Sequence, residues 1–419
     1  MSKLAKLEEL IKNLCPNGVE YKRFDEACTL NARIGWQRLT KAEYKTTGDY
    51  MLITGTDFTT SYTINYDSCV YVSEDRYSQD SKIQIKNGDV LITKDGTLGK
   101  VAQVNFLPMP ATLNGGVFVV RPKDNSLLPR YIMHFLLSDH FQKVVDQQKT
   151  GSTISHLTQA LFSRLQIPVP PIPVQEEIVR ILDSFTELTA ELTAELTARK
   201  KQYEYYVYQL LSFDNTVKTV ELRDLIDFKN GKGHEKDIVD YGKYIVINSK
   251  FISTNGKVKK YSNKQICPLY IGDILIVMSD LPNGRALAKC FLVTENNKYT
   301  LNQRIGALHV KDESVITTEF LLYVLNRNHQ LLRYDNGVDQ TNLRKDDILD
   351  IMIPVPTIEK QERIIAFLTR FDILCNDLSS GLPAEIEARQ KQYEFYRDKL
   401  LSFKETPTYE QKKEISKTE

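Results

Sequence analysis

The sequence predicts an α+β fold with two duplicated modules, separated by two long antiparallel coiled-coil helices in a pseudo-two-fold arrangement. One helical segment is written twice, over residues 167–213 and again over residues 353–403. Between residues 195–213 and residues 385–403, 12 of 19 positions are identical without a gap. A repeat of this length, placed at mid-chain and near the end, indicates two modules that are each followed by the same helical element.

Composition limits the class of protein. The chain has 419 residues, of which 42% are hydrophobic and 26% charged, as is typical of a globular protein with more than one domain. The formal net charge is +1, so composition alone does not indicate a nucleic-acid binder, although a neutral total can conceal local basic faces.

The cysteines and the N-terminus indicate a cytoplasmic protein. The six cysteines are scattered, without a C-x-x-C pattern or metal-ligand spacing to a histidine, so we expect reduced thiols that mostly fill the core. Residues 1–6 lack the apolar region of a signal peptide, and no apolar run approaches the roughly 20 residues of a membrane span.

The first module is expected within residues 1–166. Residues 3–14 carry apolar side chains at helical spacing, which predicts a short amphipathic helix. Short β-like runs then alternate with turn clusters, and two helices follow over residues 129–147 and 157–165. The strands are expected at Tyr50–Thr54, Cys69–Val72, Val90–Thr93, Lys100–Val104 and Val117–Arg121.

The second module, residues 214–352, repeats this order. The run Gly88–Ile92 matches Gly272–Ile276, and the first long helix of module one matches residues 318–333. The residues between such landmarks differ almost everywhere. A shared scaffold with different loops is how one fold recognises two different ligands.

The two repeated segments are expected to be spacer helices, over residues 167–213 and 353–403. No Pro or Gly occurs from Val174 to Leu211, a stretch of 38 residues or about 57 Å of α-helix. Apolar positions mostly alternate three and four residues apart, as in a coiled-coil seam, so the two helices are expected to pair antiparallel. In the second copy, Ser379–Pro383 predicts a break or kink. Residues 404–419 form a polar tail.

Within the first spacer helix, residues 187–198 consist of three tandem Glu-Leu-Thr-Ala units. Gain or loss of one unit would keep the reading frame and change the helix by about 6 Å and by about 40° beyond a full turn. In a coiled coil, each unit is a stutter. The units are either an ordinary solvated helix or an element that adjusts the length between the modules, and their position between duplicated modules favours the second interpretation.

Motifs that mark catalysis are absent from the sequence. It contains no complete P-loop or dinucleotide-binding glycine pattern, no G-x-S-x-G, no H-E-x-x-H and no Asn-Pro-Pro-aromatic tetrapeptide of the amino-methyltransferases. The six histidines are dispersed and none lies beside a nucleophile pattern. We therefore predict a chain that is not an enzyme and that holds no metal or cofactor.

The repeated helical signature identifies a resemblance to a known family. It runs from Ile-Pro-Val-Pro through Gln175-Glu176 to Lys201–Phe213 in the first copy, and through Gln361-Glu362 to Lys391–Phe403 in the second. This pattern resembles the specificity (S) subunit of type I restriction-modification enzymes. The tandem units resemble those of the branch in which repeat number sets the spacer of the DNA target.

This resemblance implies a non-catalytic DNA-recognition subunit. Each module would be a target recognition domain that reads one half of a bipartite, asymmetric target in double-stranded DNA. The antiparallel helices would set the gap between the halves and dock two modification (M) subunits, which use S-adenosylmethionine to methylate adenine. Restriction (R) subunits, with ATP and Mg, would join this core. No membrane partner is implied.

DNA contacts are expected from loops, because Arg and Lys read guanine, Asn and Gln read adenine, and Lys, Arg, Ser and Thr contact phosphates. The alternative for each residue is a solvated turn, and Trp36 fits a core position equally well. Tyr203, Tyr206, Tyr393 and Tyr396 are assigned to the helix seam or to an M-subunit contact. The candidates in the first module are Arg33, Trp36, Gln37, Arg38, Lys94, Asp95, Thr97, Lys100, Lys149, Ser152 and Thr153. The candidates in the second module are Lys229, Lys232, His234, Asn283, Arg285, Gln303, Arg304, Gln340, Thr341 and Asn342.

Two other functions stay open on the sequence alone. One is a fused methyltransferase or nuclease, which S-adenosylmethionine binding by the isolated chain would indicate in its methyltransferase form. The other is a coiled-coil scaffold that joins two protein-binding modules. Salt-dependent binding to duplex DNA, measured together with the M subunit, separates a DNA reader from such a scaffold.

Overall fold

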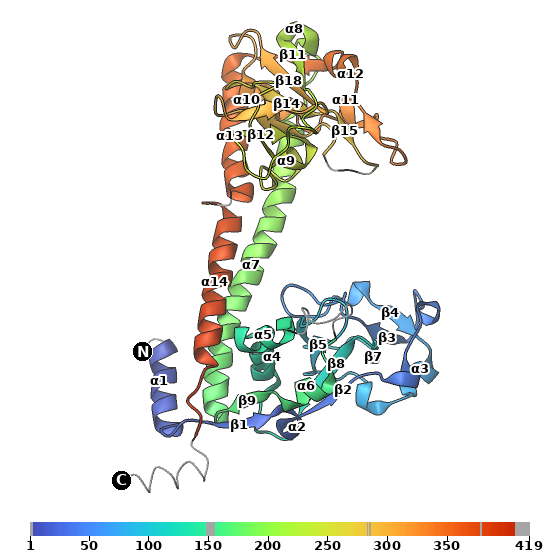
Figure 1. Ribbon diagram of the computed structural model, residues 1–419, viewed down its shortest axis with the longest axis vertical. Coiled ribbons are helices and arrows are strands. Elements are labelled where there is room, and N and C mark those ends of the chain that lie inside the picture. Colours follow the sequence, from blue (N-terminus) through green and yellow to red (C-terminus); the bar gives the residue numbers. More distant parts are fainter. Residues whose placement is uncertain (1–2, 148–155, 283, 285, 378, 407–419) are drawn as a thin grey trace. The chain divides into compact units, whose positions relative to one another are not determined.

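The chain folds into two compact units. The computed structural model describes residues 3–147, 156–282, 284, 286–377 and 379–406 (Figure 1). Unit 1 comprises residues 1–195 and 383–419, and unit 2 comprises residues 196–382. Each unit thus contains one α+β module together with parts of both repeated helical segments.

Unit 1 contains two sheets and a separate strand pair. The larger sheet is antiparallel with the order β2-β8-β5-β6, and the smaller has the order β4-β3-β7, in which β3 and β7 run parallel. Strand β1 pairs with β9. The strands are β1 Glu20–Arg23, β2 Cys28–Asn31, β3 Tyr50–Ile53, β4 Val70–Val72, β5 Val90–Thr93, β6 Val101–Gln103, β7 Ala111–Leu113, β8 Val117–Pro122 and β9 Gln166–Val169.

Helices cover one face of the larger sheet of unit 1 and connect its strands. The amphipathic helix expected at residues 3–14 is confirmed as α1. The α-helices are α1 Lys3–Leu14, α2 Phe24–Ala27, α3 Glu74–Ser78, α4 Pro129–Leu137, α5 Asp139–Gln147, α6 Gln159–Arg164, α7 Ile172–Leu211, which continues into unit 2, and α14 Leu382–Leu400. Short 3₁₀ turns occur at Gly35–Gln37, Lys41–Glu43, Tyr66–Ser68 and Ser81–Ile83.

Unit 2 repeats these sheets strand for strand. Its larger sheet has the order β11-β18-β14-β16, its smaller sheet has the order β13-β12-β17, and β10 pairs with β20. A further two-stranded pair joins β15 to β19. This repetition confirms the predicted α+β class and the duplication. The elements are β10 Thr219–Glu221, α8 Leu222–Leu225, β11 Ile226–Asn230, β12 Tyr244–Ile247, α9 Ser249–Ser253, β13 Tyr261–Ser262, β14 Ile274–Val277, β15 Ser279–Asp280, β16 Cys290–Leu292, β17 Tyr299–Leu301, β18 Ile305–Val310, α10 Thr318–Leu325, α11 His329–Leu332, β19 Thr341–Asn342, α12 Lys345–Leu349, β20 Met352–Pro354 and α13 Ile358–Asn376.

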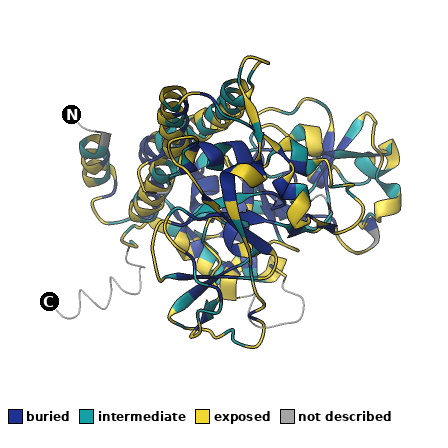
Figure 2. Ribbon diagram, turned by 90° about the horizontal axis from the view of Figure 1, so that it is seen from above, coloured by how far each residue is buried: buried dark blue, intermediate teal, exposed yellow. Residues whose placement is uncertain are grey.

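The central strand of each larger sheet separates two hydrophobic cores. In β5, Val90 and Ile92 belong to the core beneath the helices, whereas Leu91 belongs to the core between the sheets. In β14, Ile274 and Leu275 divide in the same way. Alternate residues of a strand point to opposite faces, so a strand covered on both faces is apolar throughout. The buried strands are dark blue in Figure 2.

Two expected helices are interrupted in the structure. The helix expected over residues 129–147 is wrong as one element, because Ser138 adopts an extended conformation between α4 and α5 and its hydroxyl accepts from the Phe141 amide at 3.4 Å. The helix expected over residues 318–333 divides into α10 and α11, since Asn328 caps α11 through the Gln330 amide at 2.9 Å. Both residue types cap helices by offering a side-chain acceptor to free backbone amides.

A buried glutamine anchors the start of each repeated helical segment. The Gln175 side chain accepts from the Leu128 amide at 2.9 Å and donates to the carbonyls of Ser126 and Pro170, each at 2.7 Å. Gln361 makes the same three contacts in unit 2. The acceptor contact satisfies an amide at the start of α4 or α10. This glutamine therefore joins the helical segment to the module before it.

The two helical copies pair crosswise, through equivalent residues. In unit 1, Phe185 stacks on Tyr396 with ring centroids 5.3 Å apart. In unit 2, the equivalent Phe371 contacts Tyr206 at 5.5 Å. Tyr203, Val207 and other residues of α7 pack on the core of unit 2, and α14 residues complete the core of unit 1. The antiparallel pairing is confirmed, and Tyr203, Tyr206 and Tyr396 contact the other helical copy. Tyr393 instead lies in the core of unit 1, against Tyr62 and His134.

The second copy is interrupted where the sequence predicts a break. Helix α13 ends at Asn376 and α14 begins at Leu382, with Pro383 in its first turn. Proline is tolerated there because the first amides of a helix have no intrahelical acceptor. The first copy is continuous over the 40 residues of α7.

The end of the described chain closes unit 1. The Val19 amide donates to the Lys404 carbonyl at 2.9 Å, and the Thr406 amide donates to the Val19 carbonyl at 2.9 Å. The Tyr21 hydroxyl donates to the Phe403 carbonyl at 3.0 Å. In unit 2, Phe213 is the equivalent of Phe403 and β10 is the counterpart of β1. The chain runs directly from Phe213 to β10, so a covalent connection stands where unit 1 has these hydrogen bonds.

A buried polar network holds α4 against both helical copies in unit 1. The His134 ring is fully buried, with Nδ1 3.0 Å from the Tyr393 hydroxyl and Nε2 2.8 Å from the Asp183 carboxylate. Burial lowers the pKa of His134, although Asp183 opposes this. Burial would raise the pKa of Asp183, but hydrogen bonds from His134 and Arg130 lower it. In unit 2 the equivalent contact is Tyr323 to Thr369, which has no histidine.

Replacing either anchoring glutamine should destabilise the unit that contains it. Gln175→Ala leaves the Leu128 amide and buried carbonyls without partners, at a cost of about 2–4 kcal/mol. Thermal unfolding of the full chain measures the loss, and Glu176→Ala, an exposed neighbour, is the matched control. Equal stability of the two variants would contradict the anchoring role. The pair Gln361→Ala and Glu362→Ala tests unit 2 in the same way.

Unit 1 should lose stability as the pH falls from about 7 to 5. The folded chain keeps His134 neutral because its pKa is lowered, whereas the unfolded chain takes up the proton near pH 6.5. The contribution is present above the unfolded pKa and is lost below it, by roughly 1–2 kcal/mol at pH 5. The pH dependence of thermal unfolding should be shallower in His134→Gln. An unchanged slope would show that this histidine does not carry the effect.

Candidate nucleic-acid interface

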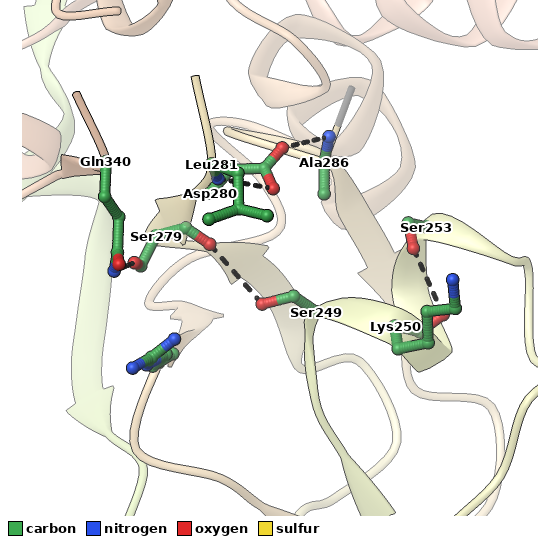
Figure 3. Close-up of a pocket in the computed structure, with 9 residues that line it drawn as sticks. Ser249, Lys250, Ser253, Ser279, Asp280, Leu281, Ala286 and Gln340 are labelled. Atoms are coloured by element: carbon green, nitrogen blue, oxygen red, sulfur yellow. Dashed lines mark hydrogen bonds between the residues drawn. The ribbon is translucent and has the colours of Figure 1, made fainter. Parts of the chain in front are cut away.

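A polar pocket in unit 2 brings several expected residues together. The pocket has a volume of about 460 Å³ and is formed by α9, the loop after β14, the turn before β18 and the segment that enters β19 (Figure 3). The pairing of β15 with β19 creates it, because Asp280 lies opposite Thr341 and Ser279 opposite Asn342. The lining residues are Ser249, Lys250, Ser253, Ser279, Asp280, Leu281, Ala286, Arg304 and Gln340.

Internal hydrogen bonds fix the wall of this pocket. Asp280 accepts from the amides of Leu281 at 2.9 Å, Ala286 at 2.7 Å and Leu287 at 3.1 Å. Gln340 donates to the Ser279 hydroxyl at 2.8 Å, as Figure 3 shows. The Asp280 carboxylate is thus occupied by backbone donors, and it gives the loop a defined shape.

The remaining charges in the pocket are positive and available. Lys250 and Arg304 are exposed, and neither side-chain head has a partner among the residues that the structure describes. A guanidinium binds two acceptors of a guanine edge, a glutamine amide binds adenine, and lysine and serine contact phosphates. The Arg304 guanidinium therefore suits the edge of a base pair and the Lys250 ammonium an adjacent phosphate, whereas the Gln340 amide nitrogen already donates to Ser279 and Asn342.

Other expected residues of unit 2 border the pocket or lie away from it. Lys232 is exposed, and its backbone pairs with Asn302 beside the turn that carries Gln303 and Arg304. Gln303 donates to Glu235 at 2.7 Å, and Asn342 is exposed.

Lys229 uses its ammonium group within the fold, where it donates to the Pro268 carbonyl at 2.8 Å while remaining exposed. Asn283 and Arg285 lie outside the described residues.

Two expected contacts of unit 2 are structural instead. His234 is fully buried, with Nε2 2.8 Å from the Thr300 hydroxyl and Nδ1 2.7 Å from the Lys232 carbonyl. Thr341 is 8% exposed, because its side chain faces inward from β19. Neither side chain reaches the surface, so both are removed from the candidate interface.

Unit 1 has an equivalent surface after β5. The Leu157 amide donates to the Lys94 carbonyl at 3.0 Å, as the Leu343 amide does to the Met278 carbonyl at 2.7 Å in unit 2. His156 Nδ1 pairs with the Asp95 carboxylate. The same backbone frame therefore presents Lys94 and Asp95 where unit 2 presents Met278 and Ser279.

The basic residues of this surface lie close together. Lys94 is half-buried with its ammonium 5.1 Å from the centre of the Phe118 ring. Burial lowers the pKa of Lys94, Asp95 opposes this, and the nearby Arg38 lowers it further. Arg38, Thr97 and Lys100 are exposed. A phosphate near Lys94 and Arg38 would relieve the repulsion between two like charges.

Arg33 and Gln37 hold the fold of unit 1 together. Arg33 is 1% exposed and donates to the carbonyls of Leu113 at 2.6 Å and Arg76 at 2.7 Å, and to Gln79 at 3.0 Å. Gln37 is 5% exposed and donates to Asp80 at 3.1 Å. Both side chains are buried with protein partners, so both are removed from the candidate interface. The Trp36 side chain and residues Lys149, Ser152 and Thr153 lie outside the described part of the chain.

Sequence reasoning missed Lys250, Ser279 and Asp280. The match of Gly88–Ile92 with Gly272–Ile276, continued by a few residues, would have made Ser279 and Asp280 equivalent to Asp95 and Gly96 of the first module. No comparable signal exists for Lys250, because α9 reaches the pocket only through the tertiary fold.

The described residues provide neither a metal centre nor a reactive thiol pair. Within the ranges that the structure describes, no group of three or more His, Cys, Asp or Glu side chains could hold a metal ion. The six cysteines are unpaired, and all but Cys290 are buried, as expected. Burial raises the pKa of Cys28 and Cys69 to about 12. None of the helices described has the length and apolar character to cross a membrane.

Comparison with known proteins relates the chain to one family. The family profile for the type I restriction modification DNA specificity domain matches twice, at residues 16–199 and 214–388. A putative type I restriction enzyme specificity subunit of Haemophilus influenzae is 31% identical over 75% of this chain and 82% of that protein. The EcoR124I/EcoR124II specificity subunit of Escherichia coli is 31% identical over 68% of this chain and 73% of that protein. The crystal structure of the S subunit from M. genitalium has a similar fold, with a TM-score of 0.52 and 15% identity over 92% of this chain and 96% of that chain.

Proposed function

The chain belongs to the type I restriction modification DNA specificity family, and we propose on this premise that each of its α+β modules reads one half of a bipartite, asymmetric DNA target. Family membership establishes DNA sequence recognition within a type I restriction-modification complex as the role of the chain, and this role is non-catalytic. The predicted family, the DNA-recognition role and the absence of enzymatic activity are thereby confirmed, whereas membership of the branch with tandem spacer repeats stays a prediction. The fused enzyme and the scaffold without DNA binding are not favoured.

One observation carries the proposal of two readers: two matching frames present different side chains at the same place. Unit 1 offers Lys94 and Asp95 after its central strand, and unit 2 offers Ser279 there together with Arg304 and Gln340. Different donors and acceptors on equal frames discriminate different base pairs. The recognition domains we propose are residues 1–166 and 214–352. The spacer segments are residues 167–213 and 353–403, whose helices begin at Ile172 and Ile358, and residues 404–419 are a tail.

The proposed DNA contacts are the exposed and half-buried polar residues of these two surfaces, with Trp36. Lys250 joins the residues expected from sequence, because it lines the pocket and its ammonium group has no partner among the residues that the structure describes. In unit 1 the contacts are Arg38, Lys94, Asp95, Thr97 and Lys100, together with Trp36, Lys149, Ser152 and Thr153. In unit 2 they are Lys229, Lys232, Gln303, Arg304, Gln340 and Asn342, together with Asn283 and Arg285.

The partners we propose are two M subunits, and R subunits that join through them, in the cytoplasm. S-adenosylmethionine belongs to the M subunits, and ATP and Mg belong to the R subunits. Two exposed aromatic side chains at equivalent positions support the binding of two M subunits. Tyr205 is 59% exposed and lies edge-on to Tyr206 at 5.6 Å, and the equivalent Phe395 is 62% exposed and edge-on to Tyr396 at 5.4 Å. A repeated exposed aromatic of this kind suits an anchor for two copies of one partner.

Arg304→Ala should alter the recognition of one half-site only. Loss of a bidentate base contact costs about 1–3 kcal/mol, or roughly 10- to 150-fold in discrimination. A base-resolution map of adenine methylation in cells that carry the chain and its M subunit measures both halves together. The exposed Lys311 follows the other end of β18, so Lys311→Ala is the matched control. Altered recognition in both halves, or in neither, would contradict the assignment of this pocket to one half-site.

The exposed aromatics should determine how many M subunits bind. Native mass spectrometry of the complex should show one M subunit for Tyr205→Ala, one for Phe395→Ala and none for the double variant, at concentrations where the parent binds two. Tyr208 is 69% exposed, but Asp398 occupies its equivalent position in the second copy, so Tyr208→Ala is the control. Two M subunits on the double variant would place the docking surfaces elsewhere.

A further inference from the structure

The two helical copies have different lengths between equivalent contacts. In α7, Tyr206 follows Phe185 by 21 residues, whereas in the second copy Tyr396 follows Phe371 by 25 residues. Phe185 contacts Tyr396 and Phe371 contacts Tyr206, so the same two aromatic contacts bound both stretches. The second copy therefore has four residues more than the first, the length of one Glu-Leu-Thr-Ala unit, and those four residues correspond to about 6 Å of α-helix.

The four additional residues of the second copy lie where that copy is not helical. Between the contacts α7 is one unbroken helix, whereas the second copy is interrupted between Asn376 and Leu382 (Figure 1). A chain of 25 residues that was helical throughout would exceed the α7 stretch by about 6 Å. Because the same two contacts bound both stretches, the interruption must take up this excess, so its residues advance along the helix axis by less than the same number of helical residues would.

The turn is built by specific side chains. The Asp377 carboxylate accepts from the Ser379 amide and from the hydroxyls of Ser379 and Ser380, each at 2.7 Å. A Cβ atom on Gly381 would lie 2.4 Å from the Ile373 carbonyl oxygen, so the turn requires glycine there.

The start of α14 also faces the tandem units within unit 1. Thr189 and Thr193 share a pocket of about 380 Å³ with Pro383 and Ile386. The start of α14, which follows the turn, therefore lies against the part of α7 that contains the tandem units.

We infer that the turn at Asp377, Ser379, Ser380 and Gly381 is a length-compensating segment, which takes up the four additional residues of the second copy so that the number of units in α7 alone sets the gap between the half-sites. This inference rests on the proposed function. Addition of one unit to α7 brings both stretches to 25 residues, and the turn then has no excess to absorb. A change in one helix thus needs no matching change in the other.

Five variants of the full chain, each expressed with its M subunit, test this by base-resolution adenine methylation maps: an insertion, a deletion, the two combined, a turn variant, and the turn variant with the insertion. Insertion of Glu-Leu-Thr-Ala after Ala198 should lengthen the gap, by about one to two base pairs, with methylation retained. Deletion of Ser380–Pro383, which removes four residues including the glycine and the proline, should leave the parent gap unchanged. The two changes combined should reduce methylation at least tenfold, because the second copy is then four residues too short. The fourth variant is Gly381→Ala with Pro383→Ala, which favours a continuous helix; it should lower methylation at the parent gap and regain it when the unit is inserted.

Each outcome decides the matter. The inference is overturned if the deletion alone shortens the gap, if the combined variant behaves like the insertion alone, or if the unit fails to restore the fourth variant. The restoration distinguishes a length mismatch from a folding defect, since an inserted unit would not repair a misfolded turn. A parent map without any gapped motif would instead refute the proposed function.

Discussion

The crosswise contacts of Phe185 with Tyr396 and of Phe371 with Tyr206 are the interactions on which the rest of the structure depends. They place the end of each helical copy on the module that precedes the other copy, so neither module has a complete core from its own segment of chain. The buried glutamines add the complementary restraint at the start of each copy. Because the contacts are equivalent in the two units, duplication of the sequence results in duplication of the packing.

Because these contacts stabilise the core and lie apart from the loops, the recognition surfaces of the two units are free to differ. The anchors, the central strands and the aromatic contacts are nearly the same in both units, whereas Lys94 and Asp95 on one frame correspond to Met278 and Ser279 on the other. A substitution on a loop supported by such a frame alters which groups are presented without disturbing the core. The network of His134, Asp183 and Tyr393 shows that even the shared frame tolerates different chemistry, since unit 2 has Tyr323 and Thr369 there.

The sequence predicts more of the fold than of the candidate site. Strand β5 was predicted with its observed bounds, because a strand covered on both faces is a continuous apolar run between turns. The breaks at Ser138 and Asn328 were missed, since their caps depend on side-chain hydrogen bonds and a local pattern does not reveal them. Arg33 and His234 resemble surface residues in sequence, but their partners come from strands about 80 and 66 positions away. Lys250 reaches its pocket only because the two-residue strands β15 and β19 pair.

The contact of Val19 with Lys404 and Thr406 has a consequence for synthesis on the ribosome. Unit 1 begins before unit 2 along the chain, but its core needs Tyr393, Leu400 and Leu401, which are translated after all of unit 2. Unit 2 needs only residues 196–382, so it can complete its packing before the residues of α14 that unit 1 needs have been translated. Domains usually fold in the order in which they emerge, and here that order is reversed. A chain that terminates early therefore leaves an unfinished apolar surface at its N-terminal end, which marks the truncated product for chaperones and proteases before it can occupy a place in the complex.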